Sequence, residues 1–199
     1  MVYRPIIIVA GEPNSIFSEI FLKSIKYKKF KSPIILIASY KLIQQQMKKL
    51  NIYRKIRLVS LLELKKNHLD NKDINLINVN FSQKKPFDKI SSKSNEYINR
   101  SFDIAIEIIK KKISNKLING PISKKFFLKK KYLGITEYLA HKTGTKNFAM
   151  LIYNKDLSVC PLTTHLPIKK VSKNINKDMI KKKIKLIDNF FKKYLNRKP

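Results

Sequence analysis

Residues able to do chemistry stand in short polar turns that follow apolar runs. One such run, residues 157–162, leads into Thr163, Thr164 and His165 and is stopped by Pro167. Near neutral pH the His165 imidazole has one ring nitrogen free to bind a metal ion or to accept a proton. Loops at strand ends carry much of the chemistry of α/β proteins, so this turn is a candidate site, although a single histidine is more often structural.

Three further turns hold residues of the same kind: residues 11–13 (Gly-Glu-Pro), 119–124 (Asn-Gly-Pro-Ile-Ser-Lys) and 134–138 (Gly-Ile-Thr-Glu-Tyr). In each turn a structural role competes with a chemical one. Glu12 is either a carboxylate at a helix start or a site residue. Lys124 is either a solvated lysine or a contact for a phosphate or carboxylate. Thr136 either caps the helix that follows or gives its hydroxyl to a ligand.

Glycine is rare in this chain, which makes its positions informative. The four glycines are Gly11, Gly120, Gly134 and Gly144, and three of them fall in turns beside candidate residues. We expect them where a side chain would not fit. The chain has no HExxH, paired-cysteine, P-loop or GxSxG motif, and the GxGxxG dinucleotide fingerprint is also missing.

The elements that must position these turns follow from the apolar pattern. Residues 5–10 form a continuous apolar run, which is typical of a strand covered on both faces, and the glycine turn after it leads into a helix ending near Lys28. The same signals predict strands at 33–39, 55–60, 74–79 and 117–118. They predict helices at 41–50, 95–113, 126–132 and 136–141. Residues 148–153 and 157–162 flank a short turn and predict a hairpin.

A long helix is expected near the C-terminus, where Ile180, Ile184 and Ile187 begin an apolar face that Asn176 is placed to cap. Strands that alternate with helices indicate an α/β fold. The 199 residues, 43% apolar, suffice for one domain with a sizeable core or for two small lobes. Cys160 has no partner for an internal disulfide and is interpreted as a buried strand residue. With no membrane-length run and no signal peptide pattern, the cytoplasm is expected.

The net charge of +31 has two interpretations. A nucleic-acid-binding module would use lysines to neutralise phosphates. Alternatively, the excess of Lys, Ile and Asn reflects an A/T-rich genome. The basic residues are mostly lysines scattered over nearly every segment, without a zinc-finger spacing or an aromatic RNA-binding signature, which favours compositional drift. The charge should still aid the capture of anionic substrates at low salt.

The order and spacing of the four turns resemble the 4-hydroxythreonine-4-phosphate dehydrogenase family of pyridoxal phosphate biosynthesis. The resemblance runs through all 199 residues, and it is most specific at 134–139 and 163–167. It implies a three-layer α/β/α fold of the isocitrate/isopropylmalate dehydrogenase-like type. Two departures stand out: Ile135 replaces a family histidine that contacts substrate, and residues 15–18 replace a glycine-rich continuation of the first turn.

The resemblance also implies a function. Members of this family carry out the NAD- or NADP-dependent oxidation of 4-phosphohydroxy-L-threonine, a small phosphorylated amino acid, in pyridoxine 5'-phosphate biosynthesis. A divalent metal (zinc, magnesium or cobalt) holds the substrate, and two subunits form a homodimer. By this resemblance His165 is a metal ligand and Thr136 is a substrate contact, whereas no catalytic residue is assigned.

Family members are considerably longer than this chain. The resemblance therefore implies that residues 1–199 are the N-terminal part of such an enzyme, truncated at the C-terminal side, and that the chain alone is incomplete. Two alternatives remain open at this point. One is a basic nucleic-acid-binding module, and the other is a non-catalytic remnant that pairs with an intact subunit.

Overall fold

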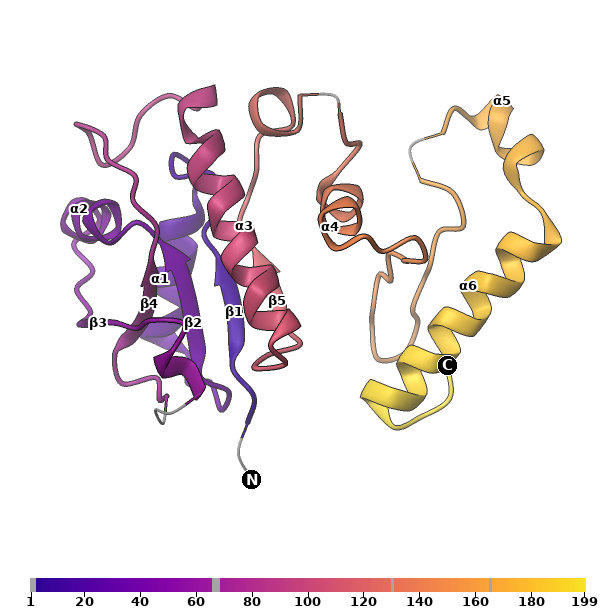
Figure 1. Ribbon diagram of the computed structural model, residues 1–199, viewed down its shortest axis with the longest axis horizontal. Helices are drawn as coiled ribbons and strands as arrows, with labels where there is room; N and C mark the ends of the chain where they lie inside the picture. The colour runs from indigo at the N-terminus through magenta and orange to yellow at the C-terminus, as the bar shows by residue number, and fades with distance from the viewer. Residues whose placement is uncertain (1–2, 66–68, 130, 165) are drawn as a thin grey trace. The chain divides into compact units, whose positions relative to one another are not determined.

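The computed structural model describes residues 3–65, 69–129, 131–164 and 166–199. The chain forms two compact units, Met1–Lys129 (unit 1) and Lys130–Pro199 (unit 2). Of the two arrangements that the length allowed, the structure therefore has two lobes. Unit 1 holds the sheet and is coloured indigo to magenta in Figure 1.

Unit 1 is built on a five-stranded sheet in the order β3-β4-β2-β1-β5, and every pairing is parallel. In the middle of the sheet, Ile8 of β1 lies beside Leu36 of β2 and Ile118 of β5. All five predicted strands of this unit are confirmed, with shorter ends for some. They are β1 (Ile6–Val9), β2 (Ile34–Ala38), β3 (Ile56–Leu58), β4 (Ile74–Asn78) and β5 (Leu117–Asn119).

Helices cover both faces of this sheet. The buried cluster that contains Ile8 and Leu36 also contains residues of α1 (Phe17–Tyr27) and α2 (Tyr40–Leu50). Alternate residues of a strand face opposite ways, and α3 (Asn95–Lys110) contacts β1 and β2. Figure 1 shows α3 in front of the sheet and α1 behind it. The predicted three-layer α/β/α architecture is confirmed for unit 1.

Two of these helices begin in different ways. The Ser39 hydroxyl caps α2 by accepting a hydrogen bond from the Leu42 amide at 3.3 Å. The cap residue of α1 is Ile16, which makes no side-chain bond, but the Ser15 hydroxyl accepts from the Phe17 amide at 3.3 Å. Ser15 therefore serves the first turn of α1 from one position before the cap residue.

A buried amide ties three strands together near the start of β4. Asn75, 1% exposed, donates from Nδ2 to the backbone oxygens of Ile34 at 3.0 Å and Asp70 at 2.7 Å. Its Oδ1 accepts from Arg57 of β3, at 3.0 Å from Nε and 2.6 Å from Nη2. A polar side chain inside this apolar sheet is thus fully hydrogen-bonded, as its burial requires.

The segment after β5 differs from its prediction. An α-helix was expected at 126–132, but the structure has the π-helical turn η3 (Lys124–Leu128), in which Ser123 Oγ accepts from the Phe126 amide at 3.1 Å. Two 3₁₀ turns complete unit 1, η1 (Glu63–Lys65) and η2 (Ser92–Ser94). A π-helical turn is rare and is often found at functional sites.

Unit 2 is mostly helical. Its elements are α4 (Ile135–Thr143), α5 (Ile168–Val171), the 3₁₀ turn η4 (Ser172–Asn174), α6 (Lys177–Phe190) and the π-helical turn η5 (Phe191–Leu195). The predicted cap of the long helix is confirmed, because Asn176 Oδ1 accepts from the Met179 amide at 2.9 Å. Within the described ranges, no helix has both the length and the apolar character needed to cross a bilayer.

The predicted hairpin is confirmed only as one antiparallel bridge, and its two strands do not form. Residues 148–153 and 157–162 form no strands, and only Ile152 and Val159 pair, through two backbone hydrogen bonds of 2.8 and 2.9 Å. The apolar run lacks cover, since Leu157 is 74% exposed and Val159 52%. Two strands without an apolar face to pack against are marginally stable. Cys160, expected as a buried strand residue, is half-buried and lies outside any strand.

Candidate active site at the carboxyl edge of the sheet

The topology of unit 1 marks one place on the sheet for a ligand. From β1 the chain proceeds to β2 on one side, and it later returns to place β5 on the other side of β1. Connections that leave β1 and β5 at their carboxyl ends therefore start side by side at a switch point. In open α/β sheets this is where ligands bind.

The turns that follow these two strands are in direct contact. The Glu12 amide donates to the Pro121 oxygen at 2.8 Å, and the Gly120 amide donates to the Val9 oxygen at 2.7 Å. Gly11 has a φ of +73°, and a Cβ on it would lie 2.4 Å from the Pro121 oxygen. A Cβ on Gly120 would lie 2.1 Å from the Ala10 oxygen. For these two glycines, the prediction that no side chain fits is confirmed.

Glu12 brings a buried carboxyl group to this switch point. It is 2% exposed, and its Oε2 accepts from the Ser94 hydroxyl at 2.8 Å while Oε1 accepts from the Asn14 amide at 3.3 Å. Burial raises the pKa of Glu12, and the bond from Ser94 only partly opposes the shift. Because α1 begins at Phe17, Glu12 is not a carboxylate of its first turn. Glu12 lies in the turn before that helix, and its role as a site residue stays a prediction.

We expect the stability of unit 1 to fall as pH rises through the raised pKa of Glu12. The unfolded chain loses this proton near the ordinary value of 4.5, whereas the folded chain keeps it to a higher pH. The folded state therefore binds more protons between the two values, so this stabilisation is complete below the lower pKa and is lost above the higher one.

Glu12→Gln should flatten this part of the curve of unfolding free energy against pH, measured by urea denaturation. A matched control is Glu96→Gln, which replaces a side chain of α3 that is 82% exposed and should keep the original slope. If the Glu12 and Glu96 variants give the same curve, the buried carboxyl group is not the source of this pH dependence.

Amide side chains hold the neighbouring loop over the same edge. Gln46 donates to the Pro13 oxygen at 2.8 Å and to the Pro86 oxygen at 3.0 Å. Asn14 and Gln83 exchange two side-chain hydrogen bonds of 3.3 and 2.7 Å. The first turn and the loop around Pro86 are therefore fixed to each other by these hydrogen bonds.

Two buried polar atoms of unit 1 have no hydrogen-bond partner within the described residues, namely Ser18 Oγ and Asn95 Oδ1. Ser18 lines a cavity of about 10 Å³ together with Glu12, Gln46 and Tyr97. Asn95 uses its Nδ2 to donate to the Phe126 oxygen at 2.9 Å. Such atoms are uncommon in folded proteins, and the cavity beside Ser18 is too small for anything larger than a water molecule.

Sequence reasoning missed several of these residues. Ser94, Asn95 and Gln46 lie in no recognisable motif, and Ser94 is 82 positions from the carboxyl group that it contacts. Only the fold brings them to the turn after β1. Lys124 is the first residue of η3 and is exposed. Both interpretations of this residue, a solvated lysine and a contact for a bound anion, therefore remain open.

Of the two predicted site residues, one lies in unit 2 and the other is outside the described residues. Thr136 is half-buried and is the second residue of α4. The cap position of that helix is occupied by Gly134, and Thr136 lies inside the helix. The capping role considered for Thr136 is therefore wrong. Its contact with substrate stays a prediction. His165 is outside the described residues, and its role as a metal ligand likewise stays a prediction.

A divalent cation needs several donors. In the described part of the chain, no three or more His, Cys, Asp or Glu side chains are grouped so that they could hold a metal ion. The described residues alone therefore do not supply a ligand set.

Comparison with known proteins decides the family. The family model described as pyridoxal phosphate biosynthetic protein PdxA matches residues 29–199. The chain belongs to the PdxA family. Its relatives include the 4-hydroxythreonine-4-phosphate dehydrogenases of Sulfurihydrogenibium sp. (strain YO3AOP1), 30% identical over 93% of this chain, and of Aquifex aeolicus (strain VF5), 33% identical over 90%. The chain spans 57% and 55% of the length of these two relatives.

Solved structures agree on the fold. A 4-hydroxythreonine-4-phosphate dehydrogenase from Burkholderia phymatum matches 95% of this PdxA-family chain with a TM-score of 0.83 at 20% identity, and the chain covers 58% of it. The corresponding enzyme from Klebsiella pneumoniae matches 95% with a TM-score of 0.83 at 22% identity, and 59% of it is covered. At this identity the likeness shows the fold, and it confirms the predicted fold class.

Proposed function

We propose that this PdxA-family chain is the N-terminal part of a dehydrogenase that oxidises 4-hydroxythreonine 4-phosphate in pyridoxal phosphate biosynthesis. The observation that carries the proposal is the family match over residues 29–199. The switch point of the sheet supports it, because two glycine turns and a buried carboxyl group meet where α/β enzymes bind ligands. The names of the Sulfurihydrogenibium and Aquifex relatives supply the substrate.

The remaining parts of the proposal follow from the resemblance to the family. In that reaction NAD or NADP would accept the hydride. His165 would be one ligand of a divalent metal (zinc, magnesium or cobalt), and a bound metal of this kind would supply polarisation of the alcohol that is oxidised. Thr136 contacts the substrate. The protein works as a homodimer in the cytoplasm, with no nucleic-acid or membrane partner. The basic surface raises the local concentration of the phosphorylated substrate.

A second candidate substrate, D-threonate 4-phosphate, is suggested by the name of another relative. One relative, 34% identical over 62 residues, is named D-threonate 4-phosphate dehydrogenase, from Pectobacterium atrosepticum. The two substrates share the phosphate and the alcohol that is oxidised, and they differ in carrying an amino group or a hydroxyl beside the carboxylate. Ile135 cannot donate or accept a hydrogen bond, and it stands next to the proposed substrate contact Thr136. Its neighbourhood is therefore a place where the two could be distinguished.

The test is an assay of nicotinamide reduction with both phosphorylated substrates, each cofactor and each metal. The chain should be assayed alone and mixed with the C-terminal portion of the Sulfurihydrogenibium relative that lies beyond the matched stretch. We expect turnover only in the mixture, with 4-hydroxythreonine 4-phosphate preferred. In that mixture His165→Ala should lower metal content and rate by about 10- to 100-fold.

His141→Ala is the matched control, because His141 is an exposed residue of α4. If neither substrate binds to the chain, alone or in the mixture, the proposed function is wrong. If the His165 and His141 variants keep the same metal content, the assignment of His165 is wrong while the reaction stands.

A further inference from the structure

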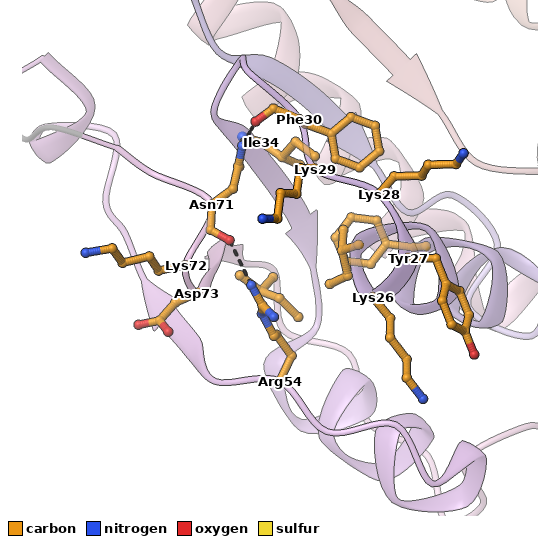
Figure 2. Close-up of a pocket in the computed structure, with 13 residues that line it drawn as sticks. Lys26, Tyr27, Lys28, Lys29, Phe30, Ile34, Arg54, Asn71, Lys72 and Asp73 are labelled. Carbon is orange, nitrogen blue, oxygen red and sulfur yellow. Dashed lines mark hydrogen bonds between the residues drawn. The ribbon is translucent and has the colours of Figure 1, made fainter.

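A larger cavity opens at the opposite, amino-terminal edge of the sheet in unit 1. Its volume is about 490 Å³, within the range of small-molecule pockets. It lies between the end of α1, the connection 28–33 and the residues that precede β3 and β4. Figure 2 shows the residues that line it. Since the candidate active site is at the carboxyl edge, this cavity is separate from it.

The walls of this cavity are held in place by one side-chain amide. Asn71 Oδ1 accepts from the Ile34 amide at 2.9 Å, and its Nδ2 donates to the Phe30 and Ser32 oxygens, both at 2.9 Å. Arg54 Nη2 donates to the backbone oxygen of Asn71 at 3.0 Å, as Figure 2 shows. Three connections between elements are thus fixed to one another. A cavity organised in this way loses little entropy when a ligand binds.

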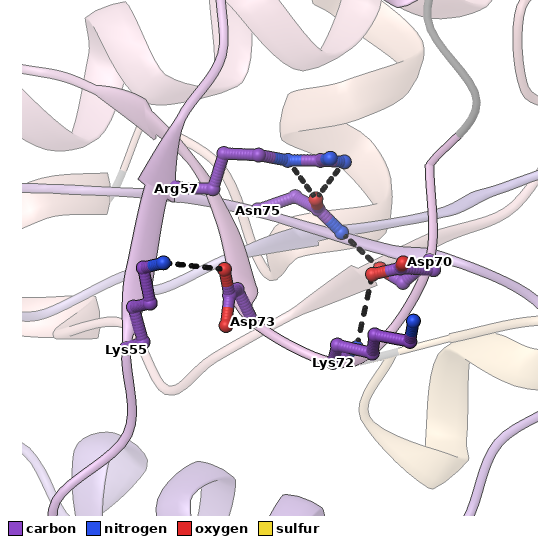
Figure 3. Close-up of polar contacts among 6 residues, drawn as sticks. All are labelled: Lys55, Arg57, Asp70, Lys72, Asp73 and Asn75. Carbon is purple, nitrogen blue, oxygen red and sulfur yellow. Dashed lines mark hydrogen bonds and ion pairs between the residues drawn. The ribbon is translucent and has the colours of Figure 1, made fainter.

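The floor of the cavity is apolar and its rim is basic. Phe21, Ile34 and Ile74 form the floor and are at most 9% exposed. Among the described lining residues five are cationic: Lys26, Lys28, Lys29, Arg54 and Lys72. The single carboxylate in the lining is Asp73, and it lies 3.9 Å from Lys55, which reduces its repulsion of an anion (Figure 3).

Two aromatic side chains complete the lining and remain accessible. Tyr27 is 70% exposed and Phe30 is 40% exposed. Lysines are scattered over the whole chain, so their presence here decides nothing by itself. What distinguishes the cavity is an arginine fixed by Asn71, beside an apolar floor and exposed rings. Arg54 has five N–H donors, and the bond to Asn71 uses one of them.

We propose that this cavity binds a small phosphorylated ligand that carries a ring, of the nucleotide type. The phosphates lie against Arg54, Lys28 and Lys29, which line the cavity, because guanidinium and ammonium groups form charge-assisted bonds to phosphate oxygens. The ring packs over the apolar floor beside Phe30. This proposal does not depend on the reaction at the carboxyl edge.

The experiment uses the full chain and isothermal titration with ADP, adenosine and pyrophosphate at physiological salt. The pocket variant is Lys28→Gln/Lys29→Gln. The control is Lys48→Gln/Lys49→Gln, an adjacent pair of exposed lysines on α2 that removes the same charge outside the cavity. We expect the pocket variant and Arg54→Gln each to weaken ADP binding by about tenfold or more. The control pair should change it by less than about twofold.

Three outcomes would overturn the proposal. The first is that the unmodified chain does not bind ADP, the second is that both double variants lose affinity equally, and the third is that pyrophosphate binds as tightly as ADP. Equal losses would mean diffuse attraction to a basic surface, and equal affinities would mean that no ring is recognised. Thermal unfolding of each variant shows whether it is folded, and Arg54→Gln provides an independent test if the double variant is not.

Discussion

Gly120→Ala should destabilise unit 1 by about 3 kcal/mol or more, the largest effect that we expect from any single substitution. The added Cβ would lie 2.1 Å from the Ala10 oxygen and 2.7 Å from the Phe17 ring. The ring can move, but the oxygen belongs to backbone next to β1 and cannot move without disturbing the sheet. Hydrogen exchange of the β1 amides, with denaturant unfolding, should show the loss.

Gly144→Ala is the control for losing a glycine. Gly144 ends α4 with a φ of +65°, and a Cβ there would meet nothing within 4 Å. The cost should be about 1 kcal/mol, that of a left-handed backbone with a side chain. Since the two glycines lie in different units, exchange must be followed separately for β1 and α4. Similar losses at both sites would refute the packing explanation for Gly120.

Asn75→Asp is the second substitution with a large expected effect, about 3 kcal/mol at neutral pH. Asn75 Nδ2 donates to two backbone oxygens, and Figure 3 shows it among its polar partners. A carboxylate would place an oxygen against those of Ile34 and Asp70. The bonds from Arg57 would compensate only in part. Urea denaturation near neutral and mildly acidic pH is the measurement, and the loss should shrink in acid, where a neutral carboxyl group can donate.

The same substitution at Asn78 provides the control, because it lies in the same strand. Asn78 is exposed, and its Oδ1 accepts from the Tyr40 amide at the start of α2 at 2.9 Å. A carboxylate at a helix start is favourable, so Asn78→Asp should stay within about 0.5 kcal/mol of the unmodified chain. An equal loss at Asn75 and Asn78 would mean that the buried bonds carry little energy.

Much of unit 1 was predictable because its strands are marked by their own residues. The continuous apolar runs of β1 and β2 can be buried only in a sheet covered on both faces, and the spacing of apolar residues in α3 supplies one cover. The scarcity of glycine also pointed to Gly11 and Gly120. Their shared reason, close contact between two turns, needed the fold.

The rest depended on contacts between distant segments. Nothing near Asn75 indicates that its amide will face Ile34, which is 41 positions away. The bond from Ser94 to Glu12 is equally hidden. The strand predicted at 157–162 is wrong because a contact is lacking. The composition of this run suits a strand, but in the described residues no layer covers Leu157 and Val159. The local apolar pattern of a segment does not show whether another element is present to cover it.

The place of β1 between β2 and β5 has a consequence during synthesis. β1 can pair with β2 as soon as β2 has been synthesised. The Val9 oxygen, in contrast, has no hydrogen-bond donor from the β5 side until Gly120 has been added to the chain. At ribosomal speeds this interval is on the order of ten seconds. For that time the apolar strand β1 has one unpaired side, so completion of the sheet depends on slow, non-local closure.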